Sequence, residues 1–369
     1  RGEYLVPWGV AELQRLGLLD VLLRAGAHWT RRQIPYGDSV APDAARRLAR
    51  DLGQAVPDVS GALCLGHPAI CDAFLEAAIE AGAKVLRGAR VTELVPGDPP
   101  TIGVEYQGQV RVFRPHLVVG ADGRGSPTAK RLGFRIESDA PHHLLGGLLV
   151  QGAEDWPQDD QTIGIFGDRV LYIFPQGSGK ARLYAATGYD ARRAWSGGGA
   201  VERFLDAFRH GALPNGDAIA AAHQAGPLQA YPNHDCWIEQ PSLPGVVLIG
   251  DAAGHNDPSL GQGLALALRD VRIVVDLLLA NRGDTPIDVA GYVGERSERL
   301  SRLRFAGRVL ARTRYEFDDR ARRRTDRLFA ACAADPSLGA LLGIFLKGPE
   351  HAPAETFAPS RWERLLSAE

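Results

Sequence analysis

The residues best suited to chemistry in this 369-residue chain lie between positions 246 and 270. An apolar run there ends at Asp251, and a loop of small residues leads to Gly261, Gln262 and Gly263. A carboxylate at the end of a buried strand can accept hydrogen bonds from the hydroxyl groups of a sugar or ribityl chain. Glycines let a flat ligand approach the main chain because they carry no Cβ. A helix that begins at such glycines directs unpaired N–H groups and its positive dipole end at that ligand.

A second element of the same kind occupies residues 117–133, where an apolar run meets Asp122 and Gly123 and Ser126 opens a helix. An Asp held between glycines suits contact with a ribose or with the pyrophosphate side of a dinucleotide. Taken singly, either element is equally compatible with an ordinary strand–turn–helix connection whose glycines serve packing. Two such elements in one chain, with their Asp residues 129 positions apart, are a more specific indication of nucleotide binding.

Together the two elements resemble the internal fingerprints of the flavoprotein aromatic hydroxylases, the p-hydroxybenzoate hydroxylase-like family of single-component FAD monooxygenases. The resemblance is strongest over residues 1–23, 116–133 and 246–270, and it is weak over residues 138–224 and after residue 288. The positions that it marks for cofactor binding are Arg1, His67, Asp122, Gly123, Gly250, Asp251, Pro258, Gly261, Gln262 and Gly263.

The resemblance implies an enzyme that holds FAD, takes electrons from NAD(P)H and uses O₂ to hydroxylate or epoxidise a small apolar or aromatic substrate. Two departures concern the flavin ring: Gly254 stands where the family usually has His, with His255 next, and Ala265 replaces the usual Asn. No catalytic acid or base can be nominated. The alternatives are another flavin-dependent oxidoreductase on the same scaffold, such as a polyprenyl reductase or a halogenase, and a remnant without activity.

Family members begin with a strand, a Gly-x-Gly-x-x-Gly turn and a helix that together hold the FAD pyrophosphate. This chain has no such turn between a strand and a helix, and its first residues resemble the segment just downstream of that unit. The interpretation is that roughly 35–40 residues, about one βαβ unit by size, are missing. A protein that is naturally shorter is the alternative.

The predicted fold class is α/β: a mostly parallel FAD-binding sheet with helices, an antiparallel substrate domain and C-terminal helices. Apolar residues recur at helical spacing over 8–24 and 72–81, and β-prone segments follow between 83 and 119. Between 144 and 187 strands follow one another without helices, which indicates an antiparallel sheet. The predicted domains are 1–137 and 226–286 for FAD, 138–225 for substrate, and a helical region, 287–369.

Three side-chain predictions leave a plainer explanation open. Arg1 suits a cofactor pyrophosphate but equally suits a frayed terminus, and His67 suits a flavin contact but equally a bond to local backbone. The aromatic residues Tyr172, Phe174 and Tyr184 could line a pocket, although core packing is the favoured explanation. The Arg-dense stretch after residue 288 is interleaved with acidic and apolar residues, so we expect a solvated helix face that packs on the core.

Composition excludes several classes of partner. A net charge of −2 gives no attraction to nucleic acid, and no run of 18 apolar residues predicts a membrane span. The four cysteines show neither Cys-x-x-Cys pairing nor partner histidines at metal spacing, so we expect reduced thiols, a cytoplasmic location and no metal site. The preference for Arg over Lys is typical of a GC-rich, and thus bacterial, genome. The oligomeric state stays open.

Overall fold

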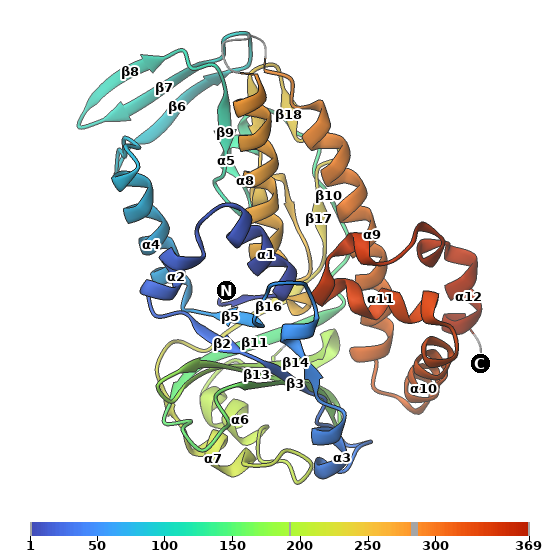
Figure 1. Ribbon diagram of the computed structural model, residues 1–369. Coiled ribbons are helices and arrows are strands. Elements are labelled where there is room, and N and C mark those ends of the chain that lie inside the picture. The colour runs from blue at the N-terminus through green and yellow to red at the C-terminus, as the bar shows by residue number, and fades with distance from the viewer. Residues whose placement is uncertain (1, 192, 282–286, 368–369) are drawn as a thin grey trace.

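The computed structural model describes residues 2–191, 193–281 and 287–367, so Arg1 lies outside the described residues. A large antiparallel sheet lies below a group of upright helices, and a separate three-stranded sheet extends from the upper end (Figure 1). The C-terminal helices form a lobe at one side. The helices are α1 (Pro7–Arg15), α2 (Leu19–Arg24), α3 (Pro42–Arg47), α4 (His67–Glu80), α5 (Pro127–Arg131), α6 (Ala200–Asp206), α7 (Gly216–Ala221), α8 (Gly263–Ala280), α9 (Ala290–Arg314), α10 (Asp319–Ala334), α11 (Pro336–Lys347) and α12 (Pro359–Ser367).

The large sheet is the predicted antiparallel element. Its central order is β11-β14-β13-β12, with β15 and β16 against the outer side of β11 and with β3 and β4 continuing beyond β12. Strand β3 pairs with β12 in parallel, and the other pairings in this sheet are antiparallel. The strands are β3 (Arg32–Ile34), β4 (Arg50–Asp51), β11 (His143–Gln151), β12 (Asp160–Phe166), β13 (Arg169–Gly177), β14 (Lys180–Gly188), β15 (His223–Gln224) and β16 (Gln229–Asn233).

Four smaller sheets have three strands each: β1-β5-β2, β10-β17-β20, β18-β19-β9 and β6-β7-β8. Their strands are β1 (Tyr4–Leu5), β2 (His28–Thr30), β5 (Ala62–Cys64), β6 (Arg90–Val95), β7 (Thr101–Tyr106), β8 (Gln109–Phe113), β9 (Val118–Gly120), β10 (Glu137–Ser138), β17 (Cys236–Trp237), β18 (Ser242–Leu243), β19 (Val246–Leu248) and β20 (Gly254–His255). In these sheets the described residues show one parallel pair, β9 with β19. Parallel pairing is thus rarer than predicted, because short turns connect β6 to β7 and β7 to β8, and such turns join antiparallel neighbours.

The helical spacing predicted over residues 8–24 is confirmed, but it belongs to two helices. Helix α1 ends at Arg15, and Gly17, with φ +70°, turns the chain into α2. The predicted helix at 72–81 is confirmed as part of α4. The region after residue 288 is confirmed as helices α9 and α10. The segment after α11 contains short 3₁₀ turns at Pro349–His351 and Ala354–Phe357.

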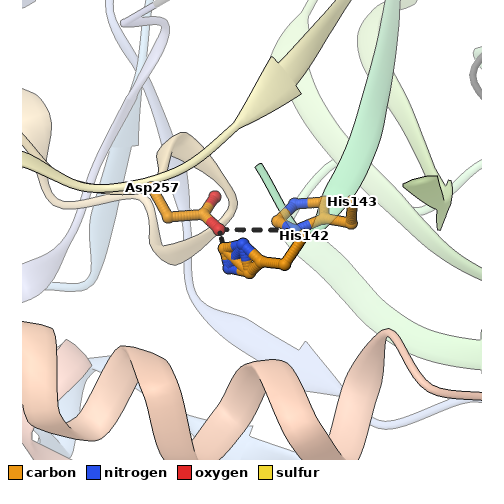
Figure 2. A group of neighbouring side chains, drawn as sticks. All are labelled: His142, His143 and Asp257. Carbon is orange, nitrogen blue, oxygen red and sulfur yellow. Dashed lines mark ion pairs between the residues drawn. The ribbon is translucent and has the colours of Figure 1, made fainter. Parts of the chain in front are cut away.

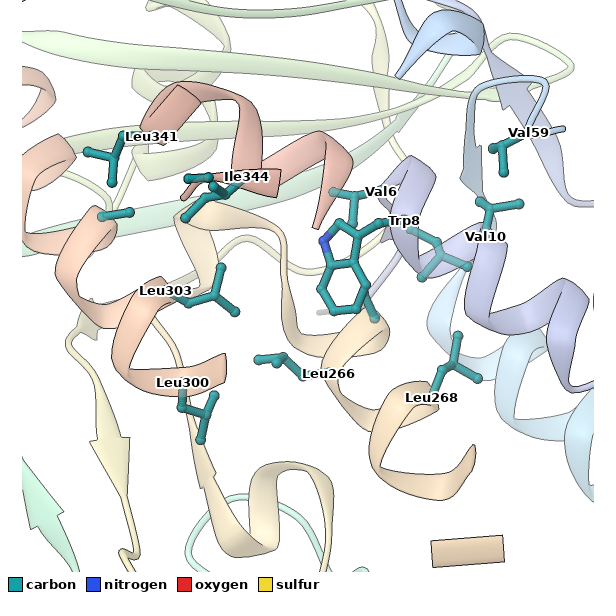
Figure 3. Packing of buried hydrophobic residues seen from close by; sticks show 14 of the residues in the cluster. Val6, Trp8, Val10, Val59, Leu266, Leu268, Leu300, Leu303, Leu341 and Ile344 are labelled. Atoms are coloured by element: carbon teal, nitrogen blue, oxygen red, sulfur yellow. The ribbon is translucent and has the colours of Figure 1, made fainter. Parts of the chain in front are cut away.

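The largest apolar core lies where α1, α8, α9 and α11 converge (Figure 3). Trp8 of α1 lies between these helices and donates its indole N–H to the side-chain oxygen of Gln262 at 2.9 Å. Leu266 of α8, Leu303 of α9 and Leu341 of α11 are buried around it. Burial of such residues is the main favourable term in folding. Here it holds the first turn of α8 in place.

Among the described residues, no single helix is long and apolar enough to cross a membrane. Helices α10 and α11 pass such a test only as a pair, and the pair is bent by 103°.

The close approach of α1 to α8 depends on Gly9. A Cβ at this position would lie 2.6 Å from the Cβ of Ala265 and 3.1 Å from its Cα. We expect Gly9→Ala to lower the free energy of unfolding by about 1–3 kcal/mol, because α8 must move away. Gly294→Ala in α9 is the matched control: a Cβ there meets no atom within 4 Å, and it should stabilise by about 0.5–1 kcal/mol. Urea denaturation of both variants measures the difference, and equal effects would contradict close packing at Gly9.

Candidate functional site

The two predicted strand–glycine–Asp elements lie side by side. Strand β19 pairs in parallel with β9, in a register that places Leu248 opposite Gly120. A Cβ on Gly120 would lie 2.5 Å from a methyl carbon of Leu248, so a larger residue would require the Leu248 side chain to move. Because parallel strands end at the same edge of a sheet, the loops that follow them, with Asp122 and Asp251, open on the same side.

A cavity of about 610 Å³ opens at this edge. Residues of the two loops and of the start of α8 line one part of the cavity, and residues on one face of the large antiparallel sheet line another. The side chains on that sheet wall are Leu145, Ile163, Tyr172, Phe174 and Tyr184. Three of these residues, Tyr172, Phe174 and Tyr184, also pack against one another in an aromatic cluster. They therefore both line the cavity and belong to the core, as the two explanations offered from the sequence had it.

Seven of the ten residues predicted to bind cofactor line this cavity: His67, Gly123, Gly250, Asp251, Pro258, Gly261 and Gly263. Two others are described but do not line it. Asp122 accepts hydrogen bonds from Ser126 Oγ and, at 2.8 Å, from the amide of Thr128, and thereby caps α5. Burial raises the pKa of Asp122, but these hydrogen bonds outweigh it and bring the pKa below its usual value.

Gln262 lies directly at the start of α8, but its side chain faces the core. Its amide nitrogen donates to the carbonyls of Leu260 at 2.6 Å and Phe345 at 3.1 Å, and its oxygen accepts from Trp8. Only the main chain of Gln262 is therefore available to a ligand. The side chain fixes the turn that presents Gly261 and Gly263.

Glycine is required or useful at four positions around the cavity for two different geometric reasons. Gly261 has φ +69° and Gly250 has φ +56°, in the left-handed region that favours glycine. A Cβ at Gly123 or Gly263 would meet no atom within 4 Å, so the space beside both residues is open. The first N–H groups of α8 have no side-chain cap. Their partial positive charge faces the cavity side of the helix and favours a ligand that carries or develops negative charge.

A buried ionic network holds α8 against the loop after β19. Asp270 of α8 is fully buried and accepts hydrogen bonds from the amide of Gly250 at 2.7 Å, from Arg296 and, at 2.7 Å, from Arg299. Arg296 also donates to the carbonyls of Gly250 and Gly254, both at 3.1 Å. The network therefore fixes the main chain on either side of Asp251.

These arginines correct the expectation of a solvated Arg-rich face. Arg296 and Arg299 of α9, and Arg324 of α10, are buried. Their burial is possible because Asp270, Glu295 and Glu316 neutralise them. A signal was present in the sequence, since Arg296 and Arg299 lie four residues before the buried Leu300 and Leu303 and so on the same helix face.

The sequence analysis did not identify Glu3 as a site residue, yet Glu3 lines the cavity. Its carboxylate accepts a hydrogen bond from the Tyr184 hydroxyl at 2.7 Å and lies 3.8 Å from Arg182. Burial alone raises the pKa of Glu3, but Arg182 and Tyr184 bring it below its usual value. The contact joins positions 181 residues apart, which no local sequence pattern can indicate.

The cavity is thus lined by two glycine-rich loops on parallel strands, by the start of α8 and by one face of the antiparallel sheet. A family model described as "FAD binding domain" matches residues 13–299, and the chain belongs to that family. The resemblance read from the sequence is thereby confirmed at the level of family and α/β fold.

Three similar proteins illustrate the family. The chain is 29% identical over 206 residues to digeranylgeranylglycerophospholipid reductase 1 of Methanococcoides burtonii, covering 53% of this chain and 47% of the relative. It is 25% identical over 325 residues to squalene monooxygenase of Mus musculus, covering 85% and 54%. The chain thus spans about half the length of these curated relatives. A crystal structure of PqsL, a probable FAD-dependent monooxygenase from Pseudomonas aeruginosa, superposes with a TM-score of 0.72 at 22% identity, covering 91% and 90%.

Proposed function

We propose that the protein is an FAD-dependent monooxygenase that uses NAD(P)H and O₂ to hydroxylate or epoxidise a small apolar or aromatic substrate. The observation that carries this proposal is the cavity of about 610 Å³ between the cofactor-type loops and an aromatic sheet wall. Such a cavity offers main-chain contacts to a flat ring on one side and an apolar surface to a second molecule on the other.

The residues present fit a flavin. The open space beside Gly123 and Gly263 would admit a flat ring against the main chain, Asp251 would accept hydrogen bonds from ribityl or ribose hydroxyls, and the N-terminus of α8 would stabilise negative charge on the ring. When bound, FAD would accept electrons from NAD(P)H and activate O₂ for transfer of one oxygen atom. The protein's own part is to orient the substrate and, through Tyr172 and Phe174, to keep water away.

Oxygenation is favoured over reduction by the extent of the similarity. The alignment with squalene monooxygenase spans 85% of the chain, whereas the alignment with the reductase spans 53%. Product analysis under ¹⁸O₂ and under argon separates the two: an oxygenase incorporates the label and forms no product without O₂. A saturated product formed equally well under argon would instead support the reductase.

The first experiment is FAD binding by the purified chain, followed by flavin fluorescence, and then NADPH and NADH oxidation with and without small aromatic and isoprenoid substrates. FAD binding with substrate-dependent NAD(P)H oxidation is expected. A folded chain that binds no FAD, and for which added FAD supports no oxidation, would favour the remnant.

Ile163→Trp tests where the substrate binds. Ile163 of β12 lies on the sheet wall, and an indole there would occupy space opposite the flavin loops. We expect substrate-stimulated NADPH oxidation to fall at least about 10-fold while FAD affinity changes little, because one badly placed group costs 1.4 kcal/mol or more. Val110→Trp on the exposed surface of β8 is the control. Equal loss in both variants would place the substrate elsewhere.

The domain division and the location are also proposals. Residues 1–137 and 226–286 would hold FAD, 138–225 would cover the substrate, and 287–369 would brace α8. The substrate sheet also includes β3 and β4 from the first segment and β16 from the third. Four cysteines that are all free thiols suit a cytoplasmic setting, and the preference for Arg over Lys suits a bacterial one. A small-molecule substrate, rather than a nucleic acid, suits the apolar cavity.

A further inference from the structure

Two histidines and a carboxylate meet beside the cavity (Figure 2). His142 precedes β11, His143 begins it, and Asp257 precedes the turn Pro258–Leu260. The Asp257 Oδ2 atom lies 3.2 Å from His142 Nε2 and 3.4 Å from His143 Nδ1. The side chains of His143 and Asp257 are 0% and 5% exposed, and that of His142 is 35% exposed.

In the neutral form of His142, the hydrogen bonds around the ring leave Nε2, the nitrogen that faces Asp257, without a proton. Nδ1 of His142 lies 3.1 Å from the carbonyl oxygen of Asn233. A carbonyl can only accept, so Nδ1 carries the hydrogen and Nε2 presents its lone pair to Asp257. The other carboxylate oxygen of Asp257 accepts from the amide of Ser259 at 2.9 Å. The lone pair of His142 Nε2 therefore faces a lone pair of Asp257 Oδ2 across 3.2 Å. Because two lone pairs repel each other, a proton or a cation is needed between these atoms.

His143 is also incompletely satisfied. Its Nδ1 is buried, and its contact with Asp257 lacks hydrogen-bond geometry. Its Nε2 lies 3.1 Å from the side-chain amide nitrogen of Asn233, whose oxygen is buried without a partner. Amide orientations are interchangeable by a flip. After the flip, the Asn233 oxygen accepts from Nε2–H, and Nδ1 carries a lone pair 3.4 Å from the Asp257 Oδ2 atom.

The geometry points to a divalent-cation site, and we propose that His142 Nε2, His143 Nδ1 and Asp257 Oδ2 bind Zn²⁺. Tetrahedral zinc, with bonds of about 2.0–2.1 Å to nitrogen and oxygen, separates neighbouring ligand atoms by about 3.3–3.4 Å. Two of the separations observed here are 3.2 and 3.4 Å. Two imidazoles and a carboxylate suit zinc, whereas Mg²⁺ and Ca²⁺ prefer oxygen ligands.

The surroundings support a bound cation. Asn233 contacts the ring nitrogen that faces away from Asp257 in each histidine: its carbonyl contacts His142 Nδ1, and its side chain contacts His143 Nε2. Hydrogen bonds to the second ring nitrogen are what orient metal-binding histidines. Asp235 lies next to the site and accepts from the amide of Asp257 at 2.7 Å, which adds negative charge. The ring of Tyr315 stacks on His143 with centroids 3.7 Å apart and limits its rotation.

The proposed site departs from the expectation that no metal is bound. Local spacing cannot reveal it, because Asp257 is separated from the two histidines by more than a hundred residues. A cation here would tie the start of β11 to the turn that carries Pro258 and Ser259, and both of these residues line the cavity. It would thus stabilise one wall of the cavity. The proposal does not depend on the proposed monooxygenase activity.

The test is a titration of the full, metal-free chain with Zn²⁺ by calorimetry, together with thermal unfolding. We expect one equivalent to bind and the melting temperature to rise by roughly 5 °C at a hundredfold excess over Kd. His142→Gln and Asp257→Asn should each weaken binding at least about 100-fold and abolish the rise. Asn at 257 keeps an oxygen for the amide of Ser259, and His142 is partly exposed, so both variants should fold, as circular dichroism can check.

His210→Gln is the matched control, because His210 Nε2 lies 3.3 Å from Asp38 in a similar His–Asp pair on the surface. It should bind Zn²⁺ as the unchanged chain does. Absence of zinc binding by the folded chain would overturn the proposal and leave a simple imidazolium–carboxylate pair. Equal affinity in His142→Gln would overturn it too, since the metal would then bind elsewhere.

Discussion

Arg296→Met is expected to lower the free energy of unfolding by about 3–5 kcal/mol, because the substitution removes a charged donor from several buried hydrogen-bond acceptors at once. Arg296 is 2% exposed, and Asp270 is fully buried. Arg299 would still contact Asp270 at 2.7 Å, but the carbonyls of Gly250 and Gly254 would lose their donor. The loop between them carries Asp251, so FAD affinity should fall together with stability.

Arg312→Met on the same helix is the control for this substitution. Arg312 is about half exposed and lies 3.7 Å from Glu316, and exposed pairs of this kind contribute about 0–1 kcal/mol. Chemical denaturation of both variants gives the two values. A loss below 1 kcal/mol for Arg296→Met would show that the network is not required for the fold. Arg296→Lys should recover part of the stability, since Lys keeps the charge but not the planar, forked arrangement of donors.

Asp251→Ala is expected to raise the Kd for FAD by about 10- to 100-fold while the fold is retained. Hydrogen bonds to a charged group contribute about 1.5–3 kcal/mol, and each 1.4 kcal/mol is tenfold in affinity. Asp251 lines the cavity directly beside Gly250, so its carboxylate is placed to meet a ribityl or ribose hydroxyl. Flavin fluorescence titration measures the change.

The control for Asp251→Ala is Asp276→Ala, which removes an exposed carboxylate from the far end of α8. Asp276 pairs with Arg272 at 3.1 Å, away from the cavity lining. Its loss should leave the Kd for FAD unchanged within about twofold, because exposed pairs contribute little. If Asp251→Ala binds FAD as tightly as the unchanged chain, the carboxylate does not contact the cofactor, and the main chain of the glycine loops alone would have to hold it.

Much of the candidate site could be predicted because it is local in sequence. The turn from Gly261 to Gly263 needs a left-handed residue and an open first helical turn, and both requirements are visible as residue types. The strands between 144 and 187 were predicted from the same kind of local pattern, an alternation of β-prone runs and turn residues. Gln262 shows the limit of that approach, since the pattern marks the residue but not the direction of its side chain.

The sequence by itself determined the turns and strands around the candidate site, because Gly, Asp and apolar residues act on their own turn or strand, and its resemblance to the flavoprotein hydroxylases indicated FAD. Only the tertiary structure decided which charged groups are buried and what they contact. The sequence pattern predicts a solvated Arg296, but the fold buries it against Asp270. Glu3 contacts Tyr184, and Asp257 contacts His142 and His143, although these residues are far apart in the sequence. Electrostatic interaction depends on distance in space and on burial, and neither quantity is encoded in local spacing.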